Sequence, residues 1–292
     1  MNAAPCLAAV IYILLLLSQL LDAESLGENP YLTVIILQLL VFARPALFFC
    51  RLRGKNYSAR IRVRLFEPGC IPFIILLSVT LMLASCAVKL GLYRIFDYTL
   101  EVTDIYEAYI PAQGGGAVLF TALAFAVFPA ITEELVFRGM MLAEYEDCGV
   151  PAAVIYSSLL FSMLHFDLKL FPVYFISGLI LAFSAYVCRS LLAPICIHTV
   201  NNIFSLFFED YIWNSILQPR NIVIFFFIIT ALLLIFLTLS LGEAGRIYKY
   251  YGRYGTQSSY VRTKSERIPA VYAVMTIPFA VCLVIFVFTV LL

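Results

Sequence analysis

Charged residues are scarce in this sequence. They make up 13% of its 292 residues, against about 25% in an average soluble protein. This shortage excludes an ordinary soluble domain. The formal net charge is only +1, so the chain also lacks the basic excess with which proteins bind phosphate backbones. A nucleic-acid partner is therefore excluded as well.

Paired cysteine motifs are also missing. The chain has eight cysteines but no CxxC and no Cys/His ligand spacing, so the sequence indicates neither a disulfide framework nor a structural zinc site. Most of them stand singly inside apolar runs, where a free cysteine behaves as a small buried apolar residue. They are Cys6, Cys50, Cys70, Cys86, Cys148, Cys188, Cys196 and Cys282.

Apolar residues are abundant, at 63% of the chain. Runs of about 20 such residues recur along its length, and each is long enough to cross a bilayer as a helix. The sequence therefore predicts an all-α polytopic membrane protein of about eight to nine transmembrane helices, which form a single integral membrane domain over 1–292. We place the spans near 4–22, 31–50, 71–93, 117–142, 150–166, 171–188, 194–208, 221–242 and 269–292.

The first span could instead be a cleaved signal peptide, because it is apolar and ends in small or polar residues. It lacks the positively charged n-region of such peptides, and LDA is a poor match to their A-x-A cleavage site. We therefore expect a retained helix.

The loops predict the orientation through an uneven distribution of charge. Lys and Arg dominate the loops 51–70 and 243–268, which the positive-inside rule places in the cytoplasm, with the N-terminus inside and the C-terminus outside. We expect these loops to determine topology and to contact anionic lipids of a prokaryotic plasma membrane. The basic residues are Arg51, Arg53, Lys55, Arg60, Arg62, Arg64, Arg246, Lys249, Arg253, Arg262, Lys264 and Arg267. The acidic residues of the opposite loops are Asp22, Glu24, Glu28, Asp97, Glu101, Asp104, Glu107, Glu209 and Asp210.

The fourth predicted span contains three charged residues in the stretch TEELVFRG, residues 132–139. Ionisable groups inside a span cost several kcal/mol and are candidates for function. Glu134 and Arg138 are four residues apart, so they share a helix face and can pair, whereas Glu133 is rotated about 100° away. The alternative is a helix end at the cytoplasmic surface, where Glu144, Glu146 and Asp147 are expected near water.

The chain has only two histidines, and both lie in apolar spans. FSMLHF places His165 in the fifth span, four residues after Phe161. ICIHTVNNIF places His198 in the seventh, four residues before Asn202. With Glu133 these residues supply a carboxylate, two imidazoles and an amide, which suffice for acid–base hydrolysis.

These motifs resemble those of a known family. EELVFR matches an E-E-x-x-x-R motif, FSMLH matches F-x-x-x-H and HTVNN matches H-x-x-x-N. In this order on successive membrane helices they are typical of the CPBP intramembrane endopeptidases. That family includes the type II CAAX prenyl endopeptidases and Abi-like bacterial proteins linked to bacteriocin processing or immunity. The resemblance covers about 117–208, the expected catalytic helix core around an intramembrane polar cavity.

The resemblance implies a role for each motif residue. Glu133 would deprotonate a water molecule that His165 helps to hold, and His198 and Asn202 would donate hydrogen bonds to the oxyanion of the tetrahedral intermediate. Glu134, Arg138 and Phe161 would support the site. Asp167, Lys169 and Tyr174 are expected to be ordinary interface anchors.

A metal site is the alternative chemistry. Glu133, His165 and His198 offer the ligand types of several catalytic zinc sites, although they lack the H-E-x-x-H spacing. Members of the family are described both as metalloproteases and as metal-free glutamate enzymes. The metal-free mechanism is favoured here, with zinc or another divalent metal kept as the alternative cofactor.

The substrate class follows from the resemblance, and the expected partners are membrane lipids and a membrane-associated peptide or protein tail, with or without a prenyl group. Two other functions compete with the peptidase. A non-enzymatic immunity or scaffold protein would tolerate the loss of Glu133. A transporter would be expected to carry inverted repeats or broken helices, and the sequence shows neither.

Overall fold

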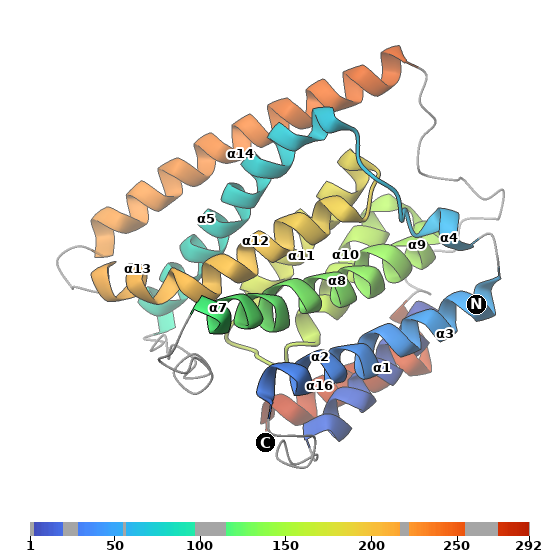
Figure 1. Ribbon diagram of the computed structural model, residues 1–292. Helices are drawn as coiled ribbons and strands as arrows, with labels where there is room; N and C mark the ends of the chain where they lie inside the picture. The colour runs from blue at the N-terminus through green and yellow to red at the C-terminus, as the bar shows by residue number, and fades with distance from the viewer. Residues whose placement is uncertain are drawn as a thin grey trace.

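The computed structural model describes residues 3–19, 29–54, 57–96, 115–216, 222–254 and 274–291. This part of the chain is helical and has no β-strand, as predicted (Figure 1). The acidic loop positions Asp22, Glu24, Glu28, Asp97, Glu101, Asp104 and Glu107 lie outside the described residues, as do Lys55, Arg262, Lys264 and Arg267.

Each of the nine predicted spans coincides with an apolar helix in the described part of the chain. By length and composition, five are long enough to cross a membrane: Tyr31–Arg53, Pro68–Tyr93, Val118–Cys148, Phe171–Cys188 and Ile222–Arg253. Four are shorter: Ala4–Ser18, Val150–Met163, Leu192–Phe207 and Ile277–Leu291. These helices confirm an all-α polytopic membrane protein.

The elements follow one another as a series of helices with short 3₁₀ and π segments. They are α1 (Ala4–Gln19), α2 (Pro30–Gln38), η2 (Leu39–Ala43), α3 (Arg44–Arg53), α4 (Tyr57–Arg60), η3 (Pro68–Cys70), α5 (Ile71–Phe96), α7 (Gly115–Ala122), η4 (Leu123–Val127), α8 (Phe128–Glu134), η5 (Leu135–Met141), α9 (Leu142–Tyr145), η6 (Glu146–Cys148), α10 (Val150–Met163), α11 (Phe171–Cys188), α12 (Leu192–Phe207), α13 (Glu209–Ile216), α14 (Ile222–Arg253) and α16 (Ile277–Leu291).

The helix that carries TEELVFRG lies in the middle of the bundle. It runs from α7 to α9 and packs against α10, α11 and α12. On one side of it, α1 packs on α16 and on α3; on the other, α5 packs on α14 (Figure 1). Two buried apolar clusters flank this central helix, one built on α1, η5, α10 and α16 and the other on α5, α11, α12 and α14.

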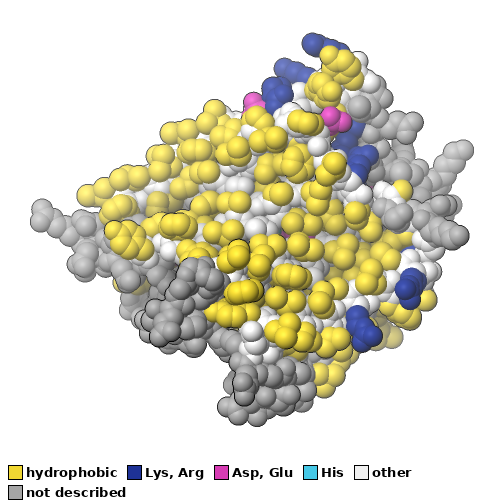
Figure 2. Space-filling model, viewed as in Figure 1, with side chains coloured by type: hydrophobic (Ala, Val, Ile, Leu, Met, Phe, Trp, Pro, Cys, Tyr) yellow, Lys and Arg dark blue, Asp and Glu magenta, His cyan; other side chains and the backbone are white. Residues whose placement is uncertain are grey.

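The outermost helix is α14, which faces away from the bundle. Only 11% of its apolar window is buried inside the protein, so most of its surface is available to lipid. The helix continues to Arg253 and so takes in the start of the predicted 243–268 loop. Figure 2 shows hydrophobic side chains over most of the visible face, with Lys and Arg gathered near one end of α14 and beside α3.

The two predicted basic loops lie on the same side of the molecule. The Arg246 guanidinium, on α14, donates a hydrogen bond of 2.6 Å to the carbonyl oxygen of Gly69. Arg64 donates to the carbonyl oxygen of Arg189 at 2.6 Å, which ties the same segment to the end of α11. The shared side predicted from charge is therefore confirmed.

Two of the three acidic residues after the motif, Glu144 and Glu146, are buried, contrary to the expectation from sequence. Glu144 and Glu146 are each only 4% exposed. They are paired with Arg53 and Arg62, and Asp147 is 3.3 Å from Arg60. The sequence reading missed this because the paired residues are more than 80 positions apart. The first basic loop thus does more than set topology, because it docks onto the end of the central helix.

The buried pair of Arg62 and Glu146 is the centre of this docking. Arg62 is 3% exposed and has a φ of 55°, an unfavourable backbone conformation for a residue with a side chain. The Tyr186 hydroxyl donates to Glu146 at 2.9 Å, and the Arg62 guanidinium lies 5.0 Å from the centre of the Tyr186 ring. Several contacts therefore hold a strained residue in place.

We expect Arg62→Ala to destabilise the protein by about 3–5 kcal/mol, because it leaves Glu146 buried without its counter-charge. The matched control is Arg246→Ala, which removes an exposed pair with Glu243 and should cost at most about 1 kcal/mol. Thermal unfolding in detergent measures both variants. Equal shifts for the two would show that the Arg62 pair contributes no more than a surface pair.

Candidate active site

The helix backbone changes its winding on both sides of the first motif. The π segments η4 and η5 enclose α8, whose last two residues are Glu133 and Glu134. Pro129 lies two residues after the end of η4. Proline has no N–H to donate to the preceding turn, which accounts for the local widening there. Single π turns inside α-helices are frequent at functional sites.

The predicted pair of Glu134 and Arg138 is confirmed. Nη1 of Arg138 is 2.7 Å from Oε1 of Glu134, and both side chains are 0% exposed. Arg138 also donates to the carbonyl oxygen of Gly178 on α11 at 3.2 Å. Its guanidinium lies 4.3 Å from the centre of the Phe161 ring, a cation–π contact that gains strength away from water.

The same carboxylate oxygen also binds His198. Nδ1 of His198 donates to Oε1 of Glu134 at 2.8 Å. This contact brings α12 to the motif helix, and the sequence reading missed it because Glu134 was assigned to Arg138 alone. With its Nδ1 proton held by the carboxylate, the neutral His198 ring carries its lone pair on Nε2.

Glu133 is placed differently from its neighbour. Its side chain makes no hydrogen bond or ion pair with any residue that the structure describes. It keeps 9% of its surface exposed, whereas Glu134 has none. Of two adjacent carboxylates, one is fully buried and bonded through Oε1 to two side chains, and the other has no hydrogen-bond partner and keeps a small exposed surface.

His165 lies on a turn instead of inside the fifth span, because α10 ends at Met163. Its Nδ1 is 3.0 Å from the carbonyl oxygen of Phe161. A carbonyl only accepts hydrogen bonds, so Nδ1 carries the proton and Nε2 holds the lone pair. The next residue, Phe166, has a φ of 50°, a strained backbone conformation for an aromatic residue.

Tyr174, which we expected to be an ordinary interface anchor, stacks its ring on His165. The two ring centres are 3.8 Å apart, with an angle of 14° between the planes. Tyr174 is on α11, and the stack fixes the plane of the imidazole at the turn. The sequence carries no helical spacing that could have indicated this contact.

Phe161 joins the three motif helices through its ring. It makes edge-to-face contacts with His165 at 4.9 Å and with His198 at 5.8 Å, measured between ring centres. Together with the Arg138 cation–π contact, the ring brings α10 and α12 to the motif helix. The contact between Phe161 and His165 expected from their spacing is thus present.

Asn202 faces the other end of the motif helix. Its amide nitrogen Nδ2 donates to the carbonyl oxygen of Ala126 in η4 at 3.4 Å. On the same helix, His198 reaches Glu134, so α12 contacts the motif helix on both sides of Glu133. Thr132 donates to Gln38 of α2 at 2.8 Å, which adds another helix to the surroundings of Glu133.

The three alternative metal ligands, Glu133, His165 and His198, are not gathered into a metal centre. Within the described ranges, no group of three or more His, Cys, Asp or Glu side chains could hold a metal ion. The Nδ1 atoms of both imidazoles are hydrogen-bonded, which leaves Nε2 as the free nitrogen of each ring. These residues as placed do not fit a metal ion, and the chemistry derived for the site uses only the side chains themselves.

The comparisons with known proteins agree with this arrangement. Residues 115–204 match the sequence model of a family described as type II CAAX prenyl endopeptidase Rce1-like, a range that contains all the motif residues. A membrane-embedded CAAX protease, MroQ of Staphylococcus aureus (strain USA300), is 26% identical over 226 residues, covering 70% of this chain and 89% of the relative. No solved structure matches.

Both matches support the resemblance of the motifs to the CPBP intramembrane endopeptidases. They support an intramembrane protease, a hydrolase embedded in the membrane.

Close packing around Gly178 holds the Arg138 contact, and we expect Gly178→Ala to disturb it. An added Cβ would lie 2.8 Å from Cβ and 3.0 Å from Cα of Ser158, so α10 and α11 would have to separate. The expected result is a loss of stability of about 1–3 kcal/mol, typical of overpacking, together with a loss of peptidase activity.

The matched control is Gly91→Ala, where an added Cβ meets nothing within 4 Å. That change should leave stability equal or slightly raised, since alanine favours helix. Thermal unfolding in detergent compares the two variants. If Gly178→Ala unfolds at the wild-type temperature, the close approach of α10 and α11 is not a constraint.

Proposed function

We propose that this protein is an intramembrane endopeptidase that hydrolyses a peptide bond in a membrane-associated peptide or protein tail, with water activated by Glu133. The observation that carries the proposal is the contrast between the two adjacent carboxylates. Glu133 is unpaired and keeps 9% of its surface exposed, whereas Glu134 is fully buried and bonded to Arg138 and His198. A general base must have a free carboxylate within reach of water.

Proton transfer follows from this placement. Glu133 takes a proton from water as the resulting hydroxide attacks the peptide carbonyl carbon, which becomes a tetrahedral intermediate with a negative oxygen. When the C–N bond breaks, Glu133 returns the proton to the leaving amine nitrogen. The lone pair on Nε2 of His165 accepts a hydrogen bond from the water and holds it beside Glu133.

His198 and Asn202 stabilise the negative oxygen. A neutral His198 cannot donate from Nε2, because its proton is on Nδ1. A second proton, taken up by Nε2 from solvent water before the attack, gives an imidazolium that the Glu134 carboxylate stabilises and that donates from Nε2 to the oxyanion. Asn202 has a second N–H besides the one directed at Ala126. Such preorganised donors contribute about 3–4 kcal/mol each to transition-state stabilisation.

The remaining parts of the proposal concern the setting of the site. Residues 117–208 form the catalytic helix core of a single membrane domain. The basic ends of α3 and α14 face the cytoplasm of a prokaryotic cell, since Lys and Arg are retained on that side. The substrate is a protein tail or short peptide reached from the membrane, with or without a prenyl group, as in the related prenyl endopeptidase family and the CAAX protease MroQ.

We expect Glu133→Gln, His165→Ala and His198→Ala each to lower the cleavage rate by at least about 100-fold, the usual contribution of a general acid–base group. The assay offers prenylated and unprenylated C-terminal peptides to the purified protein in detergent. The control is Glu243→Gln, which alters a carboxylate far along α14, and it should cleave as the wild type does. If all variants cleave at the wild-type rate, these residues are not the catalytic residues of a peptidase. That result would favour a scaffold or immunity protein.

A chelator arm in the same assay tests the metal alternative. The glutamate mechanism predicts the same rate with and without chelator. A loss on chelation that added zinc restores would favour the metalloprotease mechanism instead.

The different roles of Glu133 as base and Glu134 as structural support lead to a separate prediction. Glu134→Gln removes the counter-charge of a fully buried Arg138, so it should destabilise the protein by about 3–5 kcal/mol. Glu133→Gln removes a carboxylate that has no partner, so the unfolding temperature should stay close to that of the wild type. The unfolding temperatures of both variants in detergent measure this difference in stability. Equal shifts would contradict the assignment of Glu134 as support and Glu133 as base.

A further inference from the structure

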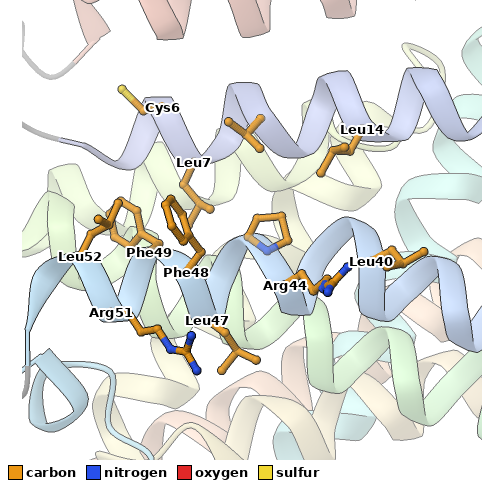
Figure 3. A pocket seen from close by; sticks show the side chains of 12 residues that line it. Cys6, Leu7, Leu14, Leu40, Arg44, Leu47, Phe48, Phe49, Arg51 and Leu52 are labelled. Carbon is orange, nitrogen blue, oxygen red and sulfur yellow. The ribbon is translucent and has the colours of Figure 1, made fainter.

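A groove outside the candidate active site runs between α1 and the continuous helix η2–α3. Its volume is about 730 Å³, within the range of ligand pockets. Figure 3 shows Leu7 and Leu14 projecting from α1 toward the second helix, which contributes Leu40, Leu47 and Phe48. The walls are almost entirely apolar, as a hydrocarbon chain requires.

Two arginines on the same helix also line this groove. Arg44 and Arg51 are exposed, and they are seven residues apart, which places them on nearly the same helix face about 10 Å apart along the axis. Arg44 lies inside the candidate span Tyr31–Arg53, about 13 Å from its basic end. A guanidinium at that depth needs an anionic partner or a path to the interface.

The described protein supplies no such partner to either arginine. The neighbouring Arg53 is paired with Glu144, and Arg60 and Arg62 are paired with Asp147 and Glu146. Arg44 and Arg51 make no ion pair or hydrogen bond with any described residue. The arginines of α3 and of the segment that follows it thus form two groups. One group is paired with acidic residues of the central helix, and the other, Arg44 and Arg51, lines the groove.

We propose that the groove between α1 and η2–α3 binds an anionic phospholipid, with its headgroup phosphate at Arg44 and Arg51 and an acyl chain along the leucine-lined walls. Charge selects this occupant, because two unpaired guanidinium groups beside an apolar groove match a phosphate attached to hydrocarbon. The binding is independent of the proposed peptidase activity and uses none of its residues.

The test measures phospholipid binding to the full-length protein in detergent. Phosphatidylglycerol and phosphatidylcholine are titrated separately, and bound lipid is counted by native mass spectrometry. The wild type is expected to bind phosphatidylglycerol in preference to phosphatidylcholine. The double variant Arg44→Gln/Arg51→Gln should bind phosphatidylglycerol about 30-fold more weakly, given the usual contribution of two membrane-surface cations.

Two further variants distinguish lipid binding in the groove from general attraction between the lipid and basic residues. Lys249→Gln/Arg253→Gln removes two exposed charges from the basic end of α14, and it should keep wild-type affinity. Leu47→Trp fills the groove and keeps both arginines, and it should lose phosphatidylglycerol binding by a similar factor to the arginine variant.

Several results would overturn the proposal. They are no bound lipid on the wild type, equal binding of the two lipids, or equal losses from the groove variant and the α14 variant. A farnesylated peptide that displaces phosphatidylglycerol and still binds the Arg44→Gln/Arg51→Gln variant would identify the groove as a site for the lipid chain of a substrate. That result would also reject the anionic phospholipid as its occupant.

Discussion

The buried ion pair between Glu134 and Arg138 is the interaction on which the rest of the site depends. Both side chains are completely buried, and such a pair is more stable the more of its remaining hydrogen-bonding groups find partners. Arg138 has partners in the Gly178 carbonyl and the Phe161 ring, and Oε1 of Glu134 has one in His198. Nε of Arg138 and Oε2 of Glu134 have none among the described residues. The contacts of this one ion pair therefore hold α10, α11 and α12 to the motif helix.

That arrangement explains how two adjacent glutamates can differ in chemistry. Consecutive residues on a helix point about 100° apart, so the partners that surround Glu134 cannot also reach Glu133. The pair thus fixes the rotation of the motif helix and, with it, the direction of the unpaired carboxylate. The unpaired Glu133 therefore follows from the orientation that Glu134 and its partners impose on the helix.

Much of this could be predicted from local sequence patterns. Apolar run length located every helix that can cross a membrane, and the i,i+4 rule predicted the pairing of Glu134 with Arg138 and of Phe161 with His165. Contacts between distant segments could not be predicted. The bond from His198 to Glu134, the stack of Tyr174 on His165 and the docking of Arg62 on Glu146 join residues 9 to 84 positions apart, where spacing carries no information.

The lengths of the histidine-bearing helices add a physical reason for the place of the site. α10 has 14 residues and α12 has 16, so they extend about 21 and 24 Å, less than the hydrocarbon thickness of about 30 Å. His165 follows the end of α10 on a turn, and irregular backbone at membrane depth is tolerated only where it is buried in protein or lines a water-filled space. The short α10 therefore brings an irregular, hydrogen-bonding turn beside the ring of Phe161 inside an otherwise apolar bundle.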